Sequence, residues 1–216
     1  MHIAIFTSPS VQKGEFVSEA IKTADKIIAA DCGALSAVSF GIIPEAVVGD
    51  FDSLDEKTIK DLKSKGSKFI TSPNVKDETD TEIAIGYAIE QGATRVSLIG
   101  GIAGDRFEHA VANMSLTYNP KVPVYLVNGP SNTWVVLGPH SVVITGKEND
   151  LLSLLPLSQV VTNIQTKGLC YPLLNEPLYF GQARGVSNVF AEKEVSVSFE
   201  NGLLLFVHTN TKELAI

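Results

Sequence analysis

The chain has 216 residues, of which 44% are hydrophobic and 19% charged, and its formal net charge at pH 7 is −7. This length suffices for one large domain or two small ones with a sizeable core. The acidic balance argues against nucleic acid as a partner, because a basic face is needed to bind the phosphate backbone, and no apolar run approaches the roughly 20 residues that span a bilayer.

The amino terminus and the cysteines bear on location. The first residues, MHIAIFTSPS, lack the basic and long apolar regions of a secretory signal, so we interpret them as a first strand. Cys32 and Cys170 have no metal-ligand spacing and fit a reducing compartment. We therefore expect a cytoplasmic protein that does not enter a membrane.

Short apolar or β-branched runs alternate with helix-like segments over the first 130 residues. We predict strands at 2–7, 26–31, 46–51, 68–72, 95–100 and 122–127. The clearest helical periodicity covers TDTEIAIGYAIEQG (79–92) and FEHAVANMSLTY (107–118). This alternation is typical of βαβ units and predicts a mostly parallel sheet covered by helices.

The pattern changes near NGPSN (128–132), after which short strands are separated by Gly, Asn and Pro. These strands predict an antiparallel sandwich or barrel. We interpret VSVSFENGLLLFVH as a hairpin that turns at Asn201-Gly202. The sequence therefore predicts two domains, an α/β domain at 1–130 and an all-β domain at 131–216.

The candidate functional residues follow predicted parallel strands, at the edge of the sheet where such folds bind ligands. Asp50 and Asp52, in VVGDFDSLDE, flank a phenylalanine directly after an apolar run. One interpretation is a polar turn before a helix that Ser53 caps, since Ser53-x-x-Glu56 has capping-box spacing. The other is a Mg²⁺ site, because hard oxygen ligands two apart in extended chain face the same way.

A second acidic group lies in DETDTEIAI. Thr79-x-x-Glu82 is another capping box, and Asp80 in the first turn of a helix is favourable against the helix dipole. The cap does not account for the crowding of Asp77 and Asp80 at the same predicted sheet edge as the first pair. Because clustered carboxylates cost free energy unless a cation neutralises them, we predict a shared metal site.

The stretch GGIAGDRFEH joins a predicted strand to a helix, so free backbone N–H groups could bind phosphate there. It matches neither the P-loop nor G-x-G-x-x-G, which disfavours a dinucleotide-dependent dehydrogenase. Arg106 could grip phosphate oxygens bidentately, whereas His109, one turn on, fits a structural role better than a catalytic one. In the second domain, Ser187 and Asn188 fit a loop and carry no signal from pattern alone.

Together these motifs resemble a known family. ADCGALSAVSFGIIPEAVVGDFDSL, KDETDTEIAI, GGIAGDRFEHAVANMSL and GLCYPLLNEPLYFGQARGVSN are similar, in order and spacing, to bacterial thiamine pyrophosphokinases. The similarity covers about residues 30–188. It implies a Rossmann-like α/β domain followed by a β-sandwich, and transfer of pyrophosphate from ATP to the hydroxyethyl oxygen of thiamine, with Mg²⁺ and with AMP as the leaving group.

The resemblance also implies site residues. Asp50, Asp52 and Asp80 would serve the metal. The chemistry of the transfer, and not the resemblance, adds that one aspartate, Asp80 or Asp77, would accept the alcohol proton. The nucleotide site would comprise Asp31, Gly33, Thr79, Gly101, Gly104, Arg106 and His109. Ser187 and Asn188 would face thiamine in a site completed across a homodimer.

Two departures from the family pattern leave alternatives open. Cys32 follows Asp31 where the family often has glycine, and Asp105 adds negative charge beside the predicted phosphate loop. A Mg²⁺-dependent transferase of the same fold with another alcohol acceptor, and a nucleotide- or thiamine-binding sensor without catalysis, therefore remain alternative interpretations.

Overall fold

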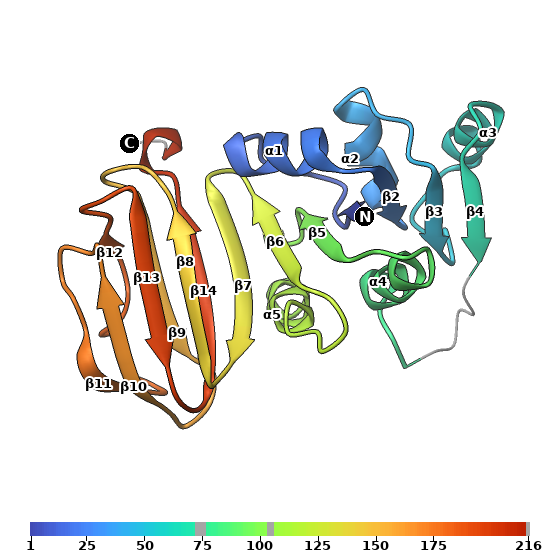
Figure 1. Cartoon of the computed structure of the whole chain (residues 1–216). Coiled ribbons are helices and arrows are strands. Elements are labelled where there is room, and N and C mark those ends of the chain that lie inside the picture. Colours follow the sequence, from blue (N-terminus) through green and yellow to red (C-terminus); the bar gives the residue numbers. More distant parts are fainter. Residues whose placement is uncertain (72–76, 103–105, 215–216) are drawn as a thin grey trace. The chain divides into compact units, whose positions relative to one another are not determined.

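The computed structural model describes residues 1–71, 77–102 and 106–214. The chain divides into two compact units, which are called unit 1 (Met1–Gly129) and unit 2 (Pro130–Ile216) below and are described separately (Figure 1). No helix within the described ranges is long and apolar enough to cross a membrane.

Unit 1 contains a parallel sheet with the strand order β6-β5-β1-β2-β3-β4. Its strands are β1 (His2–Phe6), β2 (Lys26–Ala30), β3 (Ala46–Gly49), β4 (Lys68–Thr71), β5 (Arg95–Ile99) and β6 (Val124–Asn128). Every residue of β1 and β3 is buried, as expected for strands that are covered on both faces. The predicted parallel α/β sheet is therefore confirmed, with strand ends that differ from the prediction by one or two residues.

The helices of unit 1 cover both faces of this sheet. They are α1 (Glu15–Thr23), α2 (Gly33–Ser39), α3 (Glu56–Ser64), α4 (Asp80–Glu90) and α5 (Phe107–Leu116). Ile3 and Ile5 of β1 pack in one core with α4 and α5, whereas Ala4 and Phe6 pack in another with α1, α2 and α3. The alternation of side chains along each strand thus supplies two separate cores (Figure 1).

Only one of the two predicted capping boxes supplies a cap. The Thr79 side chain accepts a hydrogen bond from the backbone N–H of Glu82 and caps α4, as predicted. The prediction that Ser53 caps the next helix is wrong, because α3 begins at Glu56 and the carboxylate of Asp55 accepts from the Thr58 N–H at 2.6 Å. Asp is as good an N-cap as Ser, so spacing alone could not separate the two.

Unit 2 contains two antiparallel sheets, with the strand orders β12-β9-β14-β7 and β11-β10-β13-β8. The strands are β7 (Ser131–Leu137), β8 (His140–Thr145), β9 (Leu151–Pro156), β10 (Val160–Lys167), β11 (Leu174–Tyr179), β12 (Asn188–Val189), β13 (Glu194–Phe199) and β14 (Leu203–Thr209), followed by a 3₁₀ turn, η1 (Thr211–Glu213).

The predicted hairpin at Asn201-Gly202 is wrong. β13 pairs with β8 and β10, whereas β14 pairs with β7 and β9 in the other sheet. The Asn-Gly turn is therefore a corner that carries the chain from one sheet to the other. Gly202 has φ +99°, so the turn needs glycine for its conformation, and that need does not depend on the two strands pairing.

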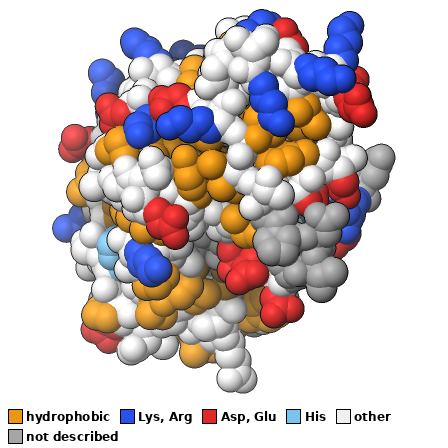
Figure 2. All heavy atoms as spheres, turned by 90° about the vertical axis from the view of Figure 1, so that its right-hand side faces the viewer, with side chains coloured by type: hydrophobic (Ala, Val, Ile, Leu, Met, Phe, Trp, Pro, Cys, Tyr) orange, Lys and Arg blue, Asp and Glu red, His pale blue; other side chains and the backbone are white. Residues whose placement is uncertain are grey.

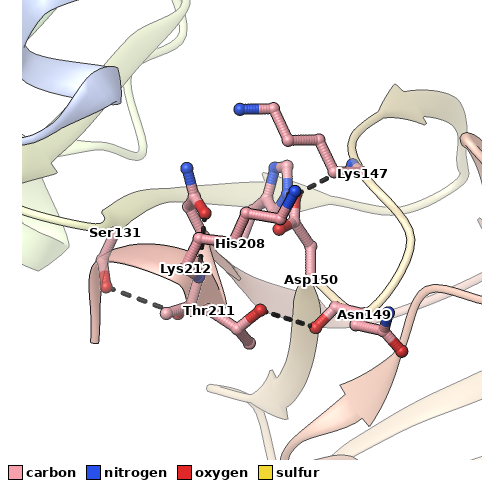
Figure 3. Close-up of polar contacts among 9 residues, drawn as sticks. Ser131, Lys147, Asn149, Asp150, His208, Thr211 and Lys212 are labelled. Atoms are coloured by element: carbon pink, nitrogen blue, oxygen red, sulfur yellow. Dashed lines mark hydrogen bonds and ion pairs between the residues drawn. The ribbon is translucent and has the colours of Figure 1, made fainter. Parts of the chain in front are cut away.

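A polar pair lies in the core of unit 2 (Figure 3). The His208 ring on β14 lies 2.9 Å from the Asp150 carboxylate, which also accepts from the backbone N–H of Lys147 at 2.9 Å. The Phe190 ring stacks on His208 with centroids 4.9 Å apart. These contacts join the segment after β8 to the last strand.

Candidate functional site

Three aspartates meet at the carboxyl edge of the parallel sheet. Asp31 follows β2, and Asp50 and Asp52 follow β3; one carboxylate oxygen from each lies within 4.8 Å of the others. We call these three residues the carboxylate cluster. Asp80, at the start of α4, borders the cluster. Gly49 lies close to both Asp31 and Asp80, since a Cβ atom placed on Gly49 would be 3.1 Å from Asp31 Cβ and 3.2 Å from Asp80 Oδ1.

The loop after β3 is tightly turned, and this turn brings Asp50 and Asp52 together. Phe51 has φ +65°, so the segment is not extended, and the expectation that extended chain aligns the two carboxylates is wrong. Instead, Asp50 Oδ1 accepts a hydrogen bond from the Asp52 N–H at 3.3 Å. The Phe51 ring packs edge-on against Phe69 of β4, with centroids 5.0 Å apart, which anchors the turn to the sheet.

Asp31 is the buried member of the cluster. Only 6% of its surface is exposed, and its Oδ1 atom has no hydrogen-bond partner among the described residues. Burial raises the pKa of Asp31, and the neighbouring Asp80 and Asp52 carboxylates raise it further, against hydrogen bonds from Ser53 and Cys32. Its φ of +40° is also unusual for a residue with a side chain.

These properties fit a hard divalent cation. Three carboxylates close together repel one another, and a buried oxygen without a partner costs free energy; a cation between them would relieve both. With only oxygen ligands present, Mg²⁺ suits the site better than zinc does. The sequence placed Asp31 at this edge of the sheet but assigned it to the nucleotide alone, so its membership of the cluster is new.

Ser53 belongs to the site although it was predicted only as a helix cap. Its hydroxyl donates to Asp52 Oδ1 at 3.0 Å, and its polar group also lowers the pKa of the neighbouring Asp31 carboxyl. A serine between a predicted strand end and a capped helix is common in ordinary turns, so the sequence carried no separate signal for this role.

Two of the glycines in the predicted nucleotide site are needed for close packing. A Cβ atom on Gly33, at the start of α2, would lie 2.0 Å from the Phe6 carbonyl oxygen of β1. Gly101 has φ +78°, and a Cβ atom there would lie 2.5 Å from Asn113 Nδ2 and 2.8 Å from Thr7 Oγ1. Both positions hold backbone close to the carboxyl edge of β1 and β5.

The basic residues after β5 are exposed. The Arg106 side chain is 69% exposed, and its Nε donates to Glu108 at 2.7 Å. This bond is the main reason why the pKa of Glu108 is lowered. His109 is half exposed, with Nε2 4.0 Å from Glu108. Gly104 and Asp105, predicted respectively as a nucleotide contact and as a perturbing charge, lie outside the described residues, and Asp77 is exposed ahead of the Thr79 cap.

Cys32 lies beside the cluster and is partly buried. Burial and the Asp31 carboxylate raise the pKa of the Cys32 thiol to about 11. Neither cysteine is in a disulfide. At neutral pH this side chain is therefore a neutral thiol and a poor metal ligand.

The predicted thiamine-binding pair lies in unit 2. The Asn188 side chain braces Tyr171, accepting from its N–H at 3.1 Å and donating to its carbonyl at 2.6 Å. Ser187 has φ +58°, and its N–H donates to the Ser153 hydroxyl at 2.9 Å. The Asn188 amide thus has a structural task in unit 2 that pattern reasoning did not identify.

The comparisons with known proteins agree on one family. The family model for the thiamin pyrophosphokinase catalytic domain matches residues 17–126, and the model for its vitamin B1 binding domain matches residues 140–204. The chain is 26% identical to the thiamine pyrophosphokinase of Bacillus subtilis over 186 residues, which covers 84% of this chain and 86% of the relative.

Solved structures share the fold over nearly the whole length. The Bacillus subtilis thiamine pyrophosphokinase structure has a TM-score of 0.85 at 23% identity and covers 97% of this chain and 99% of its own. The Geobacillus thermodenitrificans thiamin pyrophosphokinase has a TM-score of 0.81 at 24% identity, with coverages of 99% and 100%. With both family models matched in order, the chain belongs to the thiamine pyrophosphokinase family.

Proposed function

We propose that this protein carries out the reaction of its family, the ATP-dependent synthesis of thiamine diphosphate, with AMP as the second product. The observation that carries the proposal at the level of residues is the carboxylate cluster, in which Asp31 is buried with one oxygen unpartnered. It lies at the carboxyl edge of a parallel sheet, where α/β folds bind nucleotides.

The cluster suits the polyphosphate of ATP only if a cation is present, because carboxylates and phosphates repel each other. Asp31, Asp50 and Asp52 would hold Mg²⁺, with Asp80 at the border of the site. Bound Mg²⁺ would neutralise charge on the phosphate oxygens, which is the main requirement of this kind of transfer.

The chain's own residues would position the reactants. The thiamine hydroxyl oxygen would form a bond to the β-phosphorus of ATP while the bond from that phosphorus to the AMP oxygen breaks. The hydroxyl proton would pass to Asp80 or Asp77. Thr79 supports this assignment by fixing the first turn of α4 and hence the Asp80 backbone.

Arg106 and its neighbours would contact phosphate. The guanidinium group is accessible, and Glu108 is its one recorded partner within the described residues, so phosphate oxygens could replace or join that carboxylate. Gly33 and Gly101, through close backbone approach, and Thr79 and His109, through their place at the starts of α4 and α5, complete the proposed nucleotide site. Gly104 is also assigned to that site.

Unit 2 would bind thiamine. Ser187 and Asn188 are the proposed contacts, in a site completed by a second copy of the chain in a cytoplasmic homodimer. The match of unit 2 to the vitamin B1 binding model supports this assignment. In the proposed architecture, unit 1 is Rossmann-like and the two antiparallel sheets of unit 2 form a β-sandwich.

A product assay tests the proposal. The protein is incubated with ATP, Mg²⁺ and thiamine, and the nucleotides and thiamine esters are separated by chromatography. AMP and thiamine diphosphate in equal amounts are expected. ADP as the nucleotide product would rule out pyrophosphoryl transfer, and AMP formed only with another alcohol would favour the alternative transferase.

The non-catalytic alternative has its own readout. Mg²⁺-dependent ATP binding, measured by calorimetry, without any turnover would favour the sensor. Asp105 and Cys32 motivate that alternative, and reverting both to glycine would then be expected to restore turnover.

A further inference from the structure

Unit 1 contains a cavity of about 210 Å³ at the amino ends of its strands. Lys26 and Lys68 are the first residues of β2 and β4, whereas the carboxylate cluster follows the last residues of β2 and β3. The cavity therefore lies at the opposite end of the sheet from the proposed catalytic site. Its apolar lining is Ile3, Ile28 and Ala46, and its polar lining is Lys26, Glu45, Lys68, Tyr87 and Gln91.

The strand pattern places both lysines on the α4 face of the sheet. Ile28 and Ile70 pack into the core that α4 covers, and side chains two apart along a strand point the same way, so Lys26 and Lys68 point there too. In register, Ala46 lies between Ile28 and Lys68 on the neighbouring strands, and its small side chain leaves room. Tyr87 in the last turn of α4 and Gln91, the residue directly after α4, complete the wall.

The charged side chains of the cavity are free to meet a ligand. Within the described ranges, neither lysine forms an ion pair or a side-chain hydrogen bond, and the same holds for Glu45. By contrast, Lys60 and Lys65 of the nearby α3 segment each pair with a carboxylate four residues earlier.

The two lysines are not needed to cap the end of α4. Its last carbonyls already accept backbone hydrogen bonds, from Gln91 to Tyr87, from Gly92 to Ile89 and from Ala93 to Ala88. The lining thus holds two ammonium groups and one carboxylate, a net charge of +1, over an apolar floor. Figure 2 shows basic side chains concentrated in the upper part of the view. The amino ends of β3 and β4 are also at the top in Figure 1. Helix α3 contributes to that basic surface.

We propose that this cavity binds a small organic anion, with one ring or a short chain as its apolar body and a carboxylate or phosphate as its charged group. The alkyl stems of the lysines and the Tyr87 ring would contact the body, above the buried isoleucines and Ala46. The ammonium groups would bind the anion, and the Tyr87 hydroxyl and Gln91 amide would orient it. The volume is below the roughly 300 Å³ at which drug-sized pockets begin, which limits the ligand to about one ring. The proposal does not depend on the reaction proposed above.

The test uses two probes, benzoate and phenyl phosphate, which share a ring and differ in the anion. Binding to the full chain is followed by saturation-transfer NMR without ATP or Mg²⁺. We expect at least one probe to bind with a dissociation constant on the order of 1 mM, as suits a ligand of about ten non-hydrogen atoms. The stronger probe identifies the preferred anion.

Matched charge variants decide the site. Lys26→Gln/Lys68→Gln should weaken binding about tenfold, since each lysine supplies a charge-assisted contact. Lys22→Gln/Lys57→Gln removes the same charge from exposed positions on α1 and α3 and should leave binding unchanged. If the first double variant does not fold, Lys68→Gln alone, at an exposed position, should weaken binding by a smaller factor. The proposal is overturned if neither probe binds, or if the cavity and control variants bind equally.

Discussion

Among the described residues, each unit buries one aspartate, and the two aspartates differ in how their oxygens are hydrogen-bonded. Asp31 in unit 1 is 6% exposed and Asp150 in unit 2 is 3% exposed. The Asp150 carboxylate accepts from the Lys147 N–H and contacts His208, both at 2.9 Å, whereas Asp31 Oδ1 has no partner among the described residues. Both carboxylates are buried, so burial does not distinguish the structural carboxylate from the candidate functional one, whereas the unpartnered Oδ1 atom of Asp31 does.

The backbone separates the two aspartates less sharply. Asp31, in the cluster, and Phe51, between its other two members, have positive φ, +40° and +65°, whereas beside Asp150 the positive φ of +71° belongs to Asn149, a residue type that tolerates it. Conformations of this kind cost free energy and persist where surrounding structure enforces them, often at functional sites. The comparison predicts that variants of the cluster will change activity, whereas variants of the Asp150–His208 pair will change stability.

The largest expected effect is on turnover. Asp52→Asn removes one negative charge from the cluster but leaves an oxygen that can accept from Ser53, so the fold should be retained. We expect the rate of AMP formation from ATP and thiamine to fall by at least about 10²–10³-fold, the usual cost of losing one preorganised electrostatic contact. The free energy of unfolding should change by less than about 0.5 kcal/mol.

Asp55→Asn is the matched control for that variant. Asp55 is three residues further along, exposed, and caps α3, and Asn is an equally good N-cap. The control should keep its activity. Near-normal turnover in folded Asp52→Asn protein would remove the metal role from this loop.

The second effect is on stability. Asp150→Ala leaves the buried His208 ring and the Lys147 N–H without their acceptor. Leaving a buried polar group without one of its hydrogen-bond partners costs about 1–3 kcal/mol, so the urea midpoint should fall. Asp150→Asn, which can still accept from the Lys147 N–H, should lose less. If Asp150→Ala lowers the free energy of unfolding by less than about 1 kcal/mol, a buried carboxylate with hydrogen-bond partners does not mark a structural residue here.

Asp31→Asn should change the free energy of unfolding in the opposite direction from Asp150→Ala. Burial raises the pKa of Asp31, so the folded state disfavours the ionised carboxylate. The protonated side chain therefore contributes stability below the pKa of an unfolded aspartate, and this contribution is lost as the pH rises through the folded pKa. A neutral Asn avoids that loss and also tolerates positive φ. At pH 7 without Mg²⁺ we expect the variant to be more stable by about 1 kcal/mol, with reduced turnover.

The pH dependence checks the cause. The stability difference between Asp31→Asn and the parent should disappear below about pH 4, where both side chains are neutral. Chemical denaturation at several pH values measures it. A difference that persists in acid would mean that shape or hydrogen bonding, and not charge, separates the two side chains.

Much of the fold could be predicted because its signals are local. Buried parallel strands give apolar runs, such as AVVG of β3. The Thr79 cap of α4 is also a local signal, because few side chains can accept a hydrogen bond from the backbone N–H three residues later. The sheet edge that carries the cluster could also be predicted, because parallel strands bring their carboxyl ends together. These features needed no knowledge of distant contacts.

The failures concern choices that only tertiary packing makes. An Asn-Gly turn suits a hairpin and a corner between sheets equally, and the pairing of β13 with β10 and of β14 with β9 decides between them. Likewise, Ser53 and Asp55 are both good caps, and the position of the Asp31 and Asp52 carboxylates gives Ser53 its other task. The sequence predicted that Asp31 lies at the sheet edge, but the lack of a hydrogen-bond partner for its Oδ1 atom among the described residues depends on the packing around the site.

The smallest expected effect is on the alkylation rate of Cys32, whose thiol pKa responds to the negative charge of the carboxylate cluster. Burial and the Asp31 carboxylate raise the pKa of this thiol to about 11. Because only the thiolate is alkylated, roughly one molecule in a thousand is reactive at pH 8, and the rate should rise about tenfold per pH unit up to about pH 10. Mass spectrometry after iodoacetamide treatment should therefore find the exposed Cys170 alkylated first.

Asp31→Asn separates the two causes of that raised pKa. The substitution removes the nearest negative charge but keeps the thiol buried, so Cys32 should react several-fold faster at pH 8 than in the parent and still more slowly than Cys170. Equal rates in parent and variant would mean that burial alone protects the thiol. Asp31 would then be neutral at that pH, and the distinction between the unsatisfied carboxylate of unit 1 and the satisfied one of unit 2 would not be one of charge.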